Sequence, residues 1–143
     1  MKVMVMLKGA GADESRIAST REMLAMGDYN ERLVKAGIVL DGAGLKPSSE
    51  GVQLVFEGGT TSVVDGPFTE AKEIIAGYWI WQVNSVEEAV EWAKQCPTDP
   101  RGLRQLLEIR PYEDEDFGEE DTPELREGDA KLAEEIRAQH GKG

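Results

Sequence analysis

The sequence predicts an α+β domain in which an antiparallel sheet carries helices on one face, followed by a charged tail. Short apolar or alternating segments, typical of strands, are interspersed with two segments whose apolar residues recur every three or four positions, as on one face of a helix. With 143 residues, of which 40% are hydrophobic and 31% charged, the chain is long enough for one core. The composition becomes acidic after residue 111, so we expect a domain over residues 1–111 and an acidic linker with a tail helix over residues 112–143.

The first part of the chain is predicted to form a strand, a helix and a second strand. Val3 to Leu7 is continuously apolar, as in a strand at the centre of a sheet. Apolar residues recur at helical spacing from Ser19 to Ala36, and Gly37 stands at the expected C-terminal cap. Gly27 lies inside this helix, which suggests close packing against another backbone. Ile38 to Leu40 is typical of a strand, which the next four residues are expected to break.

A hairpin and a strong strand are predicted next. Val52 to Phe56 and Thr61 to Val64 flank Gly58-Gly59, a turn that tolerates positive φ. Tyr78 to Val83 is the strongest strand, since it is rich in aromatic and β-branched residues.

A second helix and a last strand complete the domain. Ser85 and Glu88 can form a capping box at the start of this helix, and Pro97 ends it. Leu103 to Ile109 is expected to be the last strand. Two strand–helix–strand units around one antiparallel sheet predict a ferredoxin-like subunit.

The sheet is expected to be apolar on both faces. Trp79 and Trp81 point to one side of their strand, and Tyr78 and Ile80 to the other. Helices on one face leave the other face in need of cover, so we expect a homodimer that packs sheet on sheet. The two tryptophans are interpreted as core or dimer-interface residues in preference to a ligand-stacking platform.

The tail leaves two alternatives open. Glu113 to Asp121 carries seven acids and no base. Thr122-Pro123-Glu124 can then start a helical run through Leu125, Leu132 and Ile136, whose apolar face is thin. This run is either a docked tail helix or partly disordered.

Composition argues against several classes of function. The net charge is −12 and no Lys/Arg cluster is present, so we expect no nucleic-acid partner. Cys96 is the single cysteine, which excludes an intrachain disulfide and favours a reducing, cytoplasmic location. No apolar run reaches a membrane-spanning length, so we expect no membrane association. Metal-ligand spacing and nucleotide-binding fingerprints are absent, so neither a metal nor a cofactor is implied.

The Asp65-Gly66-Pro67-Phe68 motif lies between the hairpin and the strong strand. Gly66 permits a backbone conformation that other residues avoid, and Pro67 fixes the next φ. Phe68 is thereby aimed in a fixed direction, and Asp65 becomes a carboxylate on a rigid corner.

This motif, with Thr69 to Glu73 and the strand that starts at Gly77, resembles the DGPF-domain branch of the YCII-related family, over about residues 1–111. The resemblance implies a dimeric α+β barrel of ferredoxin-like subunits with a cleft near the sheet–sheet interface. It also implies that some members are encoded beside extracytoplasmic-function sigma factors. The family's proposed histidine–aspartate dyad has its histidine position at Met26 here, and the one histidine of this chain is His140. A thioether cannot exchange protons, so a histidine-dependent acid–base step is unavailable.

Two classes of function follow. The first is a small-molecule-binding or enzyme-like protein with Asp65 as the catalytic or anchoring carboxylate and with a ligand pocket formed by Phe68, Tyr78, Asp41 and Glu73. The second is a non-catalytic regulatory partner of a sigma factor. For Asp65 and Asp41 the alternative interpretation is ordinary turn chemistry, in which the carboxylate accepts backbone N–H groups. For Glu73 it is a solvated helical face.

Overall fold

The computed structural model describes residues 1–9, 19–68, 74–102, 104–112 and 122–141. The chain divides into two compact units, Met1–Tyr112 and Glu113–Gly143. The described part of the second unit is a helix, α3 (Pro123–His140), which Thr122 caps by accepting the Leu125 N–H. This helix lies within the segment for which the sequence leaves a docked helix or partial disorder open, and none of its described side chains is buried.

The first unit is built on a four-stranded antiparallel sheet with the strand order β2-β5-β1-β6. Its strands are β1 (Lys2–Lys8), β2 (Val39–Gly44), β5 (Ile75–Gln82) and β6 (Leu106–Tyr112). Helix α1 (Thr20–Lys35) connects β1 to β2 across β5, and α2 (Val86–Ala93) connects β5 to β6 across β1. Two interleaved strand–helix–strand units form the ferredoxin-like fold, which confirms the predicted fold class.

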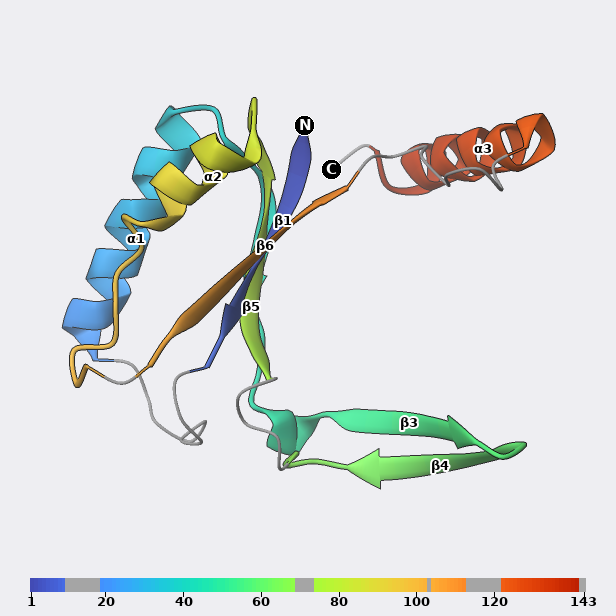
Figure 1. Cartoon of the computed structure of the whole chain (residues 1–143), viewed down its shortest axis with the longest axis horizontal. Coiled ribbons are helices and arrows are strands. Elements are labelled where there is room, and N and C mark those ends of the chain that lie inside the picture. The colour runs from blue at the N-terminus through green and yellow to red at the C-terminus, as the bar shows by residue number, and fades with distance from the viewer. Residues whose placement is uncertain (10–18, 69–73, 103, 113–121, 142–143) are drawn as a thin grey trace. The chain divides into compact units, whose positions relative to one another are not determined.

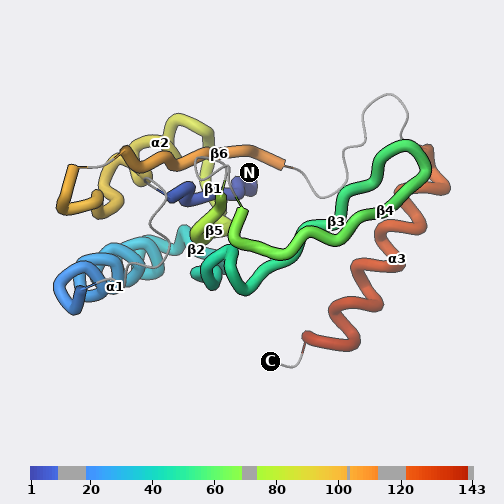
Figure 2. The backbone as a smooth tube through the Cα atoms, turned by 90° about the horizontal axis from the view of Figure 1, so that it is seen from below, coloured from blue at the N-terminus to red at the C-terminus, as the bar shows by residue number. Residues whose placement is uncertain are grey.

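Both helices of this unit cover the same face of the sheet (Figures 1 and 2). The core lies between them and the sheet, and its largest fully buried side chains are Trp81, Tyr29, Leu33, Val3 and Val5. Trp79 packs in the same core, with its ring centroid 6.0 Å from that of Tyr29 in an edge-on arrangement. The two tryptophans are therefore core residues of the first unit.

Helix α1 has the ends that its sequence predicts. Ser19 and Glu22 form a capping box at its start, and Gly37 follows its C-cap with a φ of 74°. The interpretation of Gly27 as a point of close backbone packing is wrong for the described residues, because nothing lies within 4 Å of the position that a Cβ would take.

Strand β2 is longer than the sequence predicts. It continues from Val39 through Gly44 and pairs with β5, whereas Asp41 to Gly44 was expected to end it. An added Cβ on Gly42 would lie 3.0 Å from Trp79 Cδ1. Glycine therefore allows this strand to approach β5 closely, and the pairing outweighs its low strand propensity.

The hairpin strands are β3 (Val52–Glu57) and β4 (Thr60–Asp65), joined at Gly58-Gly59 with φ values of 57° and 79°. Strands and turn are as predicted, since a two-residue turn with positive φ at both positions favours hairpins. The hairpin nevertheless forms a separate two-stranded sheet with all its residues exposed, and β2 holds the place beside β5.

Two further predictions shift by a few residues. Strand β6 begins at Leu106, and Gln105 just before it donates a hydrogen bond from its side chain to the Pro97 carbonyl oxygen at 3.1 Å. At the start of α2, Ser85 accepts the Glu88 N–H as expected, but the Glu88 carboxylate accepts from the Asn84 N–H. Within the described residues, no helix is both long and apolar enough to cross a bilayer.

Candidate ligand-binding cleft

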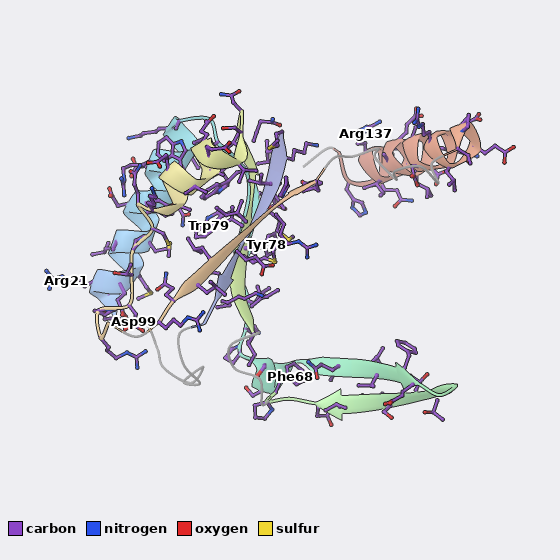
Figure 3. All side chains as sticks on the ribbon, in the orientation of Figure 1. Arg21, Phe68, Tyr78, Trp79, Asp99 and Arg137 are labelled. Carbon is purple, nitrogen blue, oxygen red and sulfur yellow. The ribbon has the colours of Figure 1, made fainter. Side chains whose placement is uncertain are left out.

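The fold gathers several chain segments at one end of the four-stranded sheet. β1 and β2 end there, and the antiparallel strands β5 and β6 begin there. The start of α1 and the connection from α2 to β6 lie at the same end, as the labelled Arg21 and Asp99 show in Figure 3. Residues that are distant in the sequence therefore form one surface.

A cleft of about 680 Å³ lies at this end of the sheet. Its volume falls within the roughly 300–1,000 Å³ typical of ligand sites. Much of its wall is apolar and is contributed by β1, α1, β5 and the adjoining connections, at Leu7, Met23, Met26, Leu45, Ile75 and Pro97.

The cleft is open because only the C-terminal half of α1 packs closely on the sheet. Tyr29 and Leu33 in that half are fully buried, whereas Met23 is 57% exposed. Figure 1 shows α1 diverging from the sheet toward its N-terminal end. Ala25 and Ala76, small residues on the lining, leave this space unfilled.

A second cleft of about 410 Å³ adjoins the first and shares Leu7, Met26 and Ala76 with it. Its lining includes three glycines of β2 and β5, which add no side-chain bulk, at Gly42, Gly44 and Gly77. Asn30 also lines this cleft, and its Oδ1 accepts a hydrogen bond of 2.9 Å from Trp79 Nε1. An indole N–H can only donate, so the contacting atom of Asn30 is its oxygen, and the amide group remains available as a donor.

Charged groups surround the first cleft. Four described lining residues are basic, namely Lys8, Arg21, Lys46 and Arg101, and two are acidic, namely Glu22 and Asp99. Both acids already have partners. Glu22 accepts the Ser19 N–H at 2.7 Å in the capping box. Asp99 accepts from Arg101 Nε at 3.1 Å and from Arg101 Nη2 at 2.8 Å.

The wall formed by residues 97–101 is fixed by local hydrogen bonds. The Arg101 N–H also donates to Asp99, and the Gly102 N–H closes a turn on the Asp99 carbonyl oxygen. The Asp99 side chain is only 9% exposed, so its bidentate pair with Arg101 is stronger than an ordinary surface ion pair.

Comparison with known proteins identifies the family of the first unit. The model of the YCII-related domain matches residues 1–113. The chain belongs to the YCII-related domain family. It is also 31% identical, over 80 residues, to an uncharacterized protein of Rhizobium meliloti (strain 1021). That alignment covers 56% of this chain and 64% of the relative, so this chain spans less than two thirds of the relative's length.

In this YCII-related protein, Met26 lines both clefts. The family resemblance implies a histidine at this position. The position thus faces the clefts, but its thioether offers polarizable apolar contact instead of proton transfer.

Two ionisable groups lie in the core close to the clefts. Burial raises the pKa of the Cys96 thiol to about 11. Burial also raises the pKa of Tyr29, whose hydroxyl donates to the Trp92 carbonyl oxygen at 2.8 Å. Both groups are therefore neutral near pH 7, and Cys96 does not have the lowered pKa of an activated thiol.

Asp65 and Phe68 lie at the base of the hairpin, away from the described cleft linings. Asp65 ends β4 and is exposed. The Phe68 N–H donates to the buried Ser48 hydroxyl at 3.2 Å, and its ring packs near Gly51. Figure 3 shows Phe68 at the foot of the hairpin. The Asp65-Gly66-Pro67-Phe68 motif therefore attaches the hairpin to the short 3-10 helix η1 (Ser48–Glu50).

Asp41 and Tyr78 form a second group, on β2 and β5. By strand alternation both side chains project from the helix-free face, and Figure 3 shows Tyr78 on the side of the sheet opposite to Trp79. Asp41 Oδ1 accepts the N–H of Gly42 at 2.8 Å, which is the local turn-like interaction expected of Asp. Tyr78 is also one of the β5 residues that line the second cleft, although its side chain projects from the opposite face. Glu73 lies outside the described residues.

Sequence reasoning did not identify the basic residues of the first cleft. Their signal is positional: Lys8 ends β1 and Arg21 lies in the first turn of α1, whereas Lys46 follows β2 and Arg101 lies in the connection from α2 to β6. Combined with the ferredoxin-like strand order, these positions place all four at one end of the sheet.

Proposed function

We propose that this YCII-related protein binds a small molecule in the two connected clefts beneath α1. The observation that carries the proposal is the 680 Å³ cleft, with its largely apolar wall and few charged groups. Ligand sites are typically concave and mostly apolar, with a small number of polar groups in fixed positions. Binding is proposed ahead of catalysis because Met26 cannot transfer a proton.

Filling the cleft tests this proposal. Ala25→Trp places a large side chain on the lining, and Ala133→Trp makes the same change on α3. A panel of small acids, amides and amines is screened by thermal shift against wild type and both variants. A ligand present at about 100 times its Kd stabilises a protein by about 2.7 kcal/mol. We expect ligand shifts of several degrees in wild type and Ala133→Trp, and none in Ala25→Trp. Equal shifts in all three proteins would place binding elsewhere.

A homodimer that pairs the helix-free faces of two sheets is proposed as well. Met4, Tyr78 and Ile80 lie on that face by strand alternation and are only partly buried within one chain. Ile80→Glu should convert the dimer to a monomer in light scattering, whereas Leu24→Glu on exposed α1 should not. A wild-type monomer at micromolar concentration would contradict the proposal. The catalytic role of Asp65 stays a prediction, and it depends on such a partner to cover this exposed residue.

The alternative function is that of a regulatory partner of an extracytoplasmic-function sigma factor. The observation that favours it is the exposed apolar surface of the hairpin, where Leu54, Phe56 and Val63 are 56%, 75% and 65% exposed. Co-purification with a sigma factor encoded beside the gene, lost in Phe56→Ser, would support this alternative.

Two finer assignments complete the proposal. We propose that the chain belongs to the DGPF branch of the family because it contains the Asp65-Gly66-Pro67-Phe68 motif. This motif attaches the hairpin to η1. A reducing, cytoplasmic location is proposed on the single cysteine, which is buried and unpaired.

A further inference from the structure

We propose that the ligand of the first cleft is an organic anion, with an apolar body and a carboxylate head that Arg21 binds. This inference rests on the binding function proposed above and adds the chemical class of the ligand.

The charge on the cleft is opposite to that of the chain. The whole sequence has 28 acidic and 16 Lys or Arg residues, yet among the described lining residues the bases outnumber the acids by four to two. The two acids, Glu22 and Asp99, are engaged by the Ser19 N–H and by Arg101. Arg101 offsets the charge of Asp99, and the capping hydrogen bond holds the Glu22 carboxylate at the helix start, so the described lining keeps an excess of basic groups on an otherwise acidic protein.

Arg21 is the group best placed to meet the head group. It lies in the first turn of α1, its side chain is exposed, and it has no hydrogen-bond or ion-pair partner among the described residues. The positive end of the α1 dipole adds to its charge at the same place. A guanidinium binds a carboxylate with two parallel hydrogen bonds, which a neutral amide or an amine cannot accept in the same way.

The other three bases of the lining each lie beside an acidic side chain. Lys8 is bonded to Glu108 at 3.2 Å, and Arg101 is bonded to Asp99. Lys46 approaches Glu50 only to 3.8 Å, with its side chain 82% exposed. Each of these three bases therefore has an acidic neighbour, whereas Arg21 supplies hydrogen bonds that no described protein group uses.

The apolar wall defines the rest of the ligand. Leu7, Met23, Met26 and Ile75 offer contacts to a hydrocarbon or aromatic body, and the two methionines can adapt to its shape. An anion without such a body would leave this wall wet, so inorganic anions are expected to bind weakly.

A matched panel tests the proposal on the full-length protein. It contains the carboxylic acid, the neutral amide and the amine of each of several bodies, for example 4-phenylbutyrate, 4-phenylbutanamide and 4-phenylbutylamine, together with phenyl phosphate and inorganic phosphate. Binding is measured by isothermal titration at low and at high salt. The proposal predicts that the acids bind most tightly and that their affinity falls with added salt.

Arg21→Gln identifies the group responsible, and Arg137→Gln on α3 is the control (Figure 3). We expect Arg21→Gln to weaken acid binding by roughly tenfold or more, to leave the amides unchanged and to preserve the melting temperature. Arg137→Gln should change neither affinity. If amides or amines bind as tightly as acids, the anion proposal fails although the binding function stands. Preference for the phosphates over the acids would overturn the carboxylate assignment. If no panel member binds, both proposals fail.

Discussion

The Trp79 indole is held on several sides in the core. The Tyr29 ring meets it edge-on, the Trp81 ring centroid lies 5.9 Å away, and Asn30 accepts its N–H. Strand alternation predicts that both tryptophans share a face, but it does not reveal Asn30, which is 49 positions away in the sequence. Trp81 Nε1, by contrast, is buried without a partner among the described residues.

The hydrogen bond of Asn30 makes a prediction at this scale. Asn30→Ala leaves the Trp79 indole N–H without its acceptor, so the free energy of unfolding should fall by about 1–3 kcal/mol. Urea unfolding measures the change. Asn30→Asp keeps an acceptor and should lose less, and in a Trp79→Phe background the Asn30→Ala cost should largely vanish. An equal cost with and without the indole would show that the hydrogen bond contributes little.

The Cys96 thiol makes a second prediction. Because burial raises its pKa from 9.0 to about 11, the unfolded chain loses this proton at a lower pH than the folded chain. Its contribution to stability is therefore complete below pH 9 and is lost as the pH rises to about 11. Burial raises the pKa of Tyr29 in the same direction, which extends the loss to higher pH. Unfolding free energies of wild type and Cys96→Ala at a series of pH values should converge through this window. If the two proteins lose stability in parallel as the pH rises, the raised pKa of the Cys96 thiol is contradicted.

At the scale of elements, α1 and β2 differ in how far sequence predicts them. The ends of α1 follow from local capping residues, Ser19 and Gly37, and were predicted closely. Strand β2 extends through Gly42 because pairing with β5 satisfies its backbone, and such pairing is a tertiary effect that local propensity does not contain. Because β2 pairs with β5 at the edge of the four-stranded sheet, β3 and β4 form a separate two-stranded sheet.

Two glycines of these elements should respond oppositely to alanine. Gly27 has open space around it within a helix, so Gly27→Ala should stabilise the protein by about 0.5–1 kcal/mol. Gly66 is different, because a Cβ there would overlap the Ser48 carbonyl oxygen. Gly66→Ala should therefore detach the hairpin base from η1 and lower the melting temperature. Calorimetry of both variants checks the pair, and destabilisation by Gly27→Ala would show an unseen contact on α1.

At the scale of the whole molecule, the family match over residues 1–113 and the first compact unit, Met1–Tyr112, nearly coincide. Sequence predicted the ferredoxin-like order because each strand and helix has its own local pattern. It did not predict the cleft, since the open space beneath the N-terminal half of α1, where Met23 is 57% exposed, depends on how the helix packs on the sheet and not on a local pattern. Asp65 was predicted as a site residue because it belongs to a compact motif. Within one chain, that motif anchors the hairpin.

The division into two units makes a prediction about the tail. No described side chain of α3 is buried, so a chain that ends at Tyr112 should keep its cooperative thermal transition within a few degrees of wild type. Circular dichroism at 222 nm measures it, with a loss of helical signal from α3. A collapse of the transition would show that the tail stabilises the first unit.

The most direct test of the cleft as a binding site uses the five methionines as probes. Met23 and Met26 line the cleft, Met4 and Met6 lie on the helix-free face, and Met1 is at the N-terminus. In ¹³C-methyl-methionine NMR of the wild-type protein, titration with 4-phenylbutyrate should shift the Met23 and Met26 resonances and leave the other three in place. Shifts confined to Met4 and Met6 would place the site on the helix-free face and contradict the account.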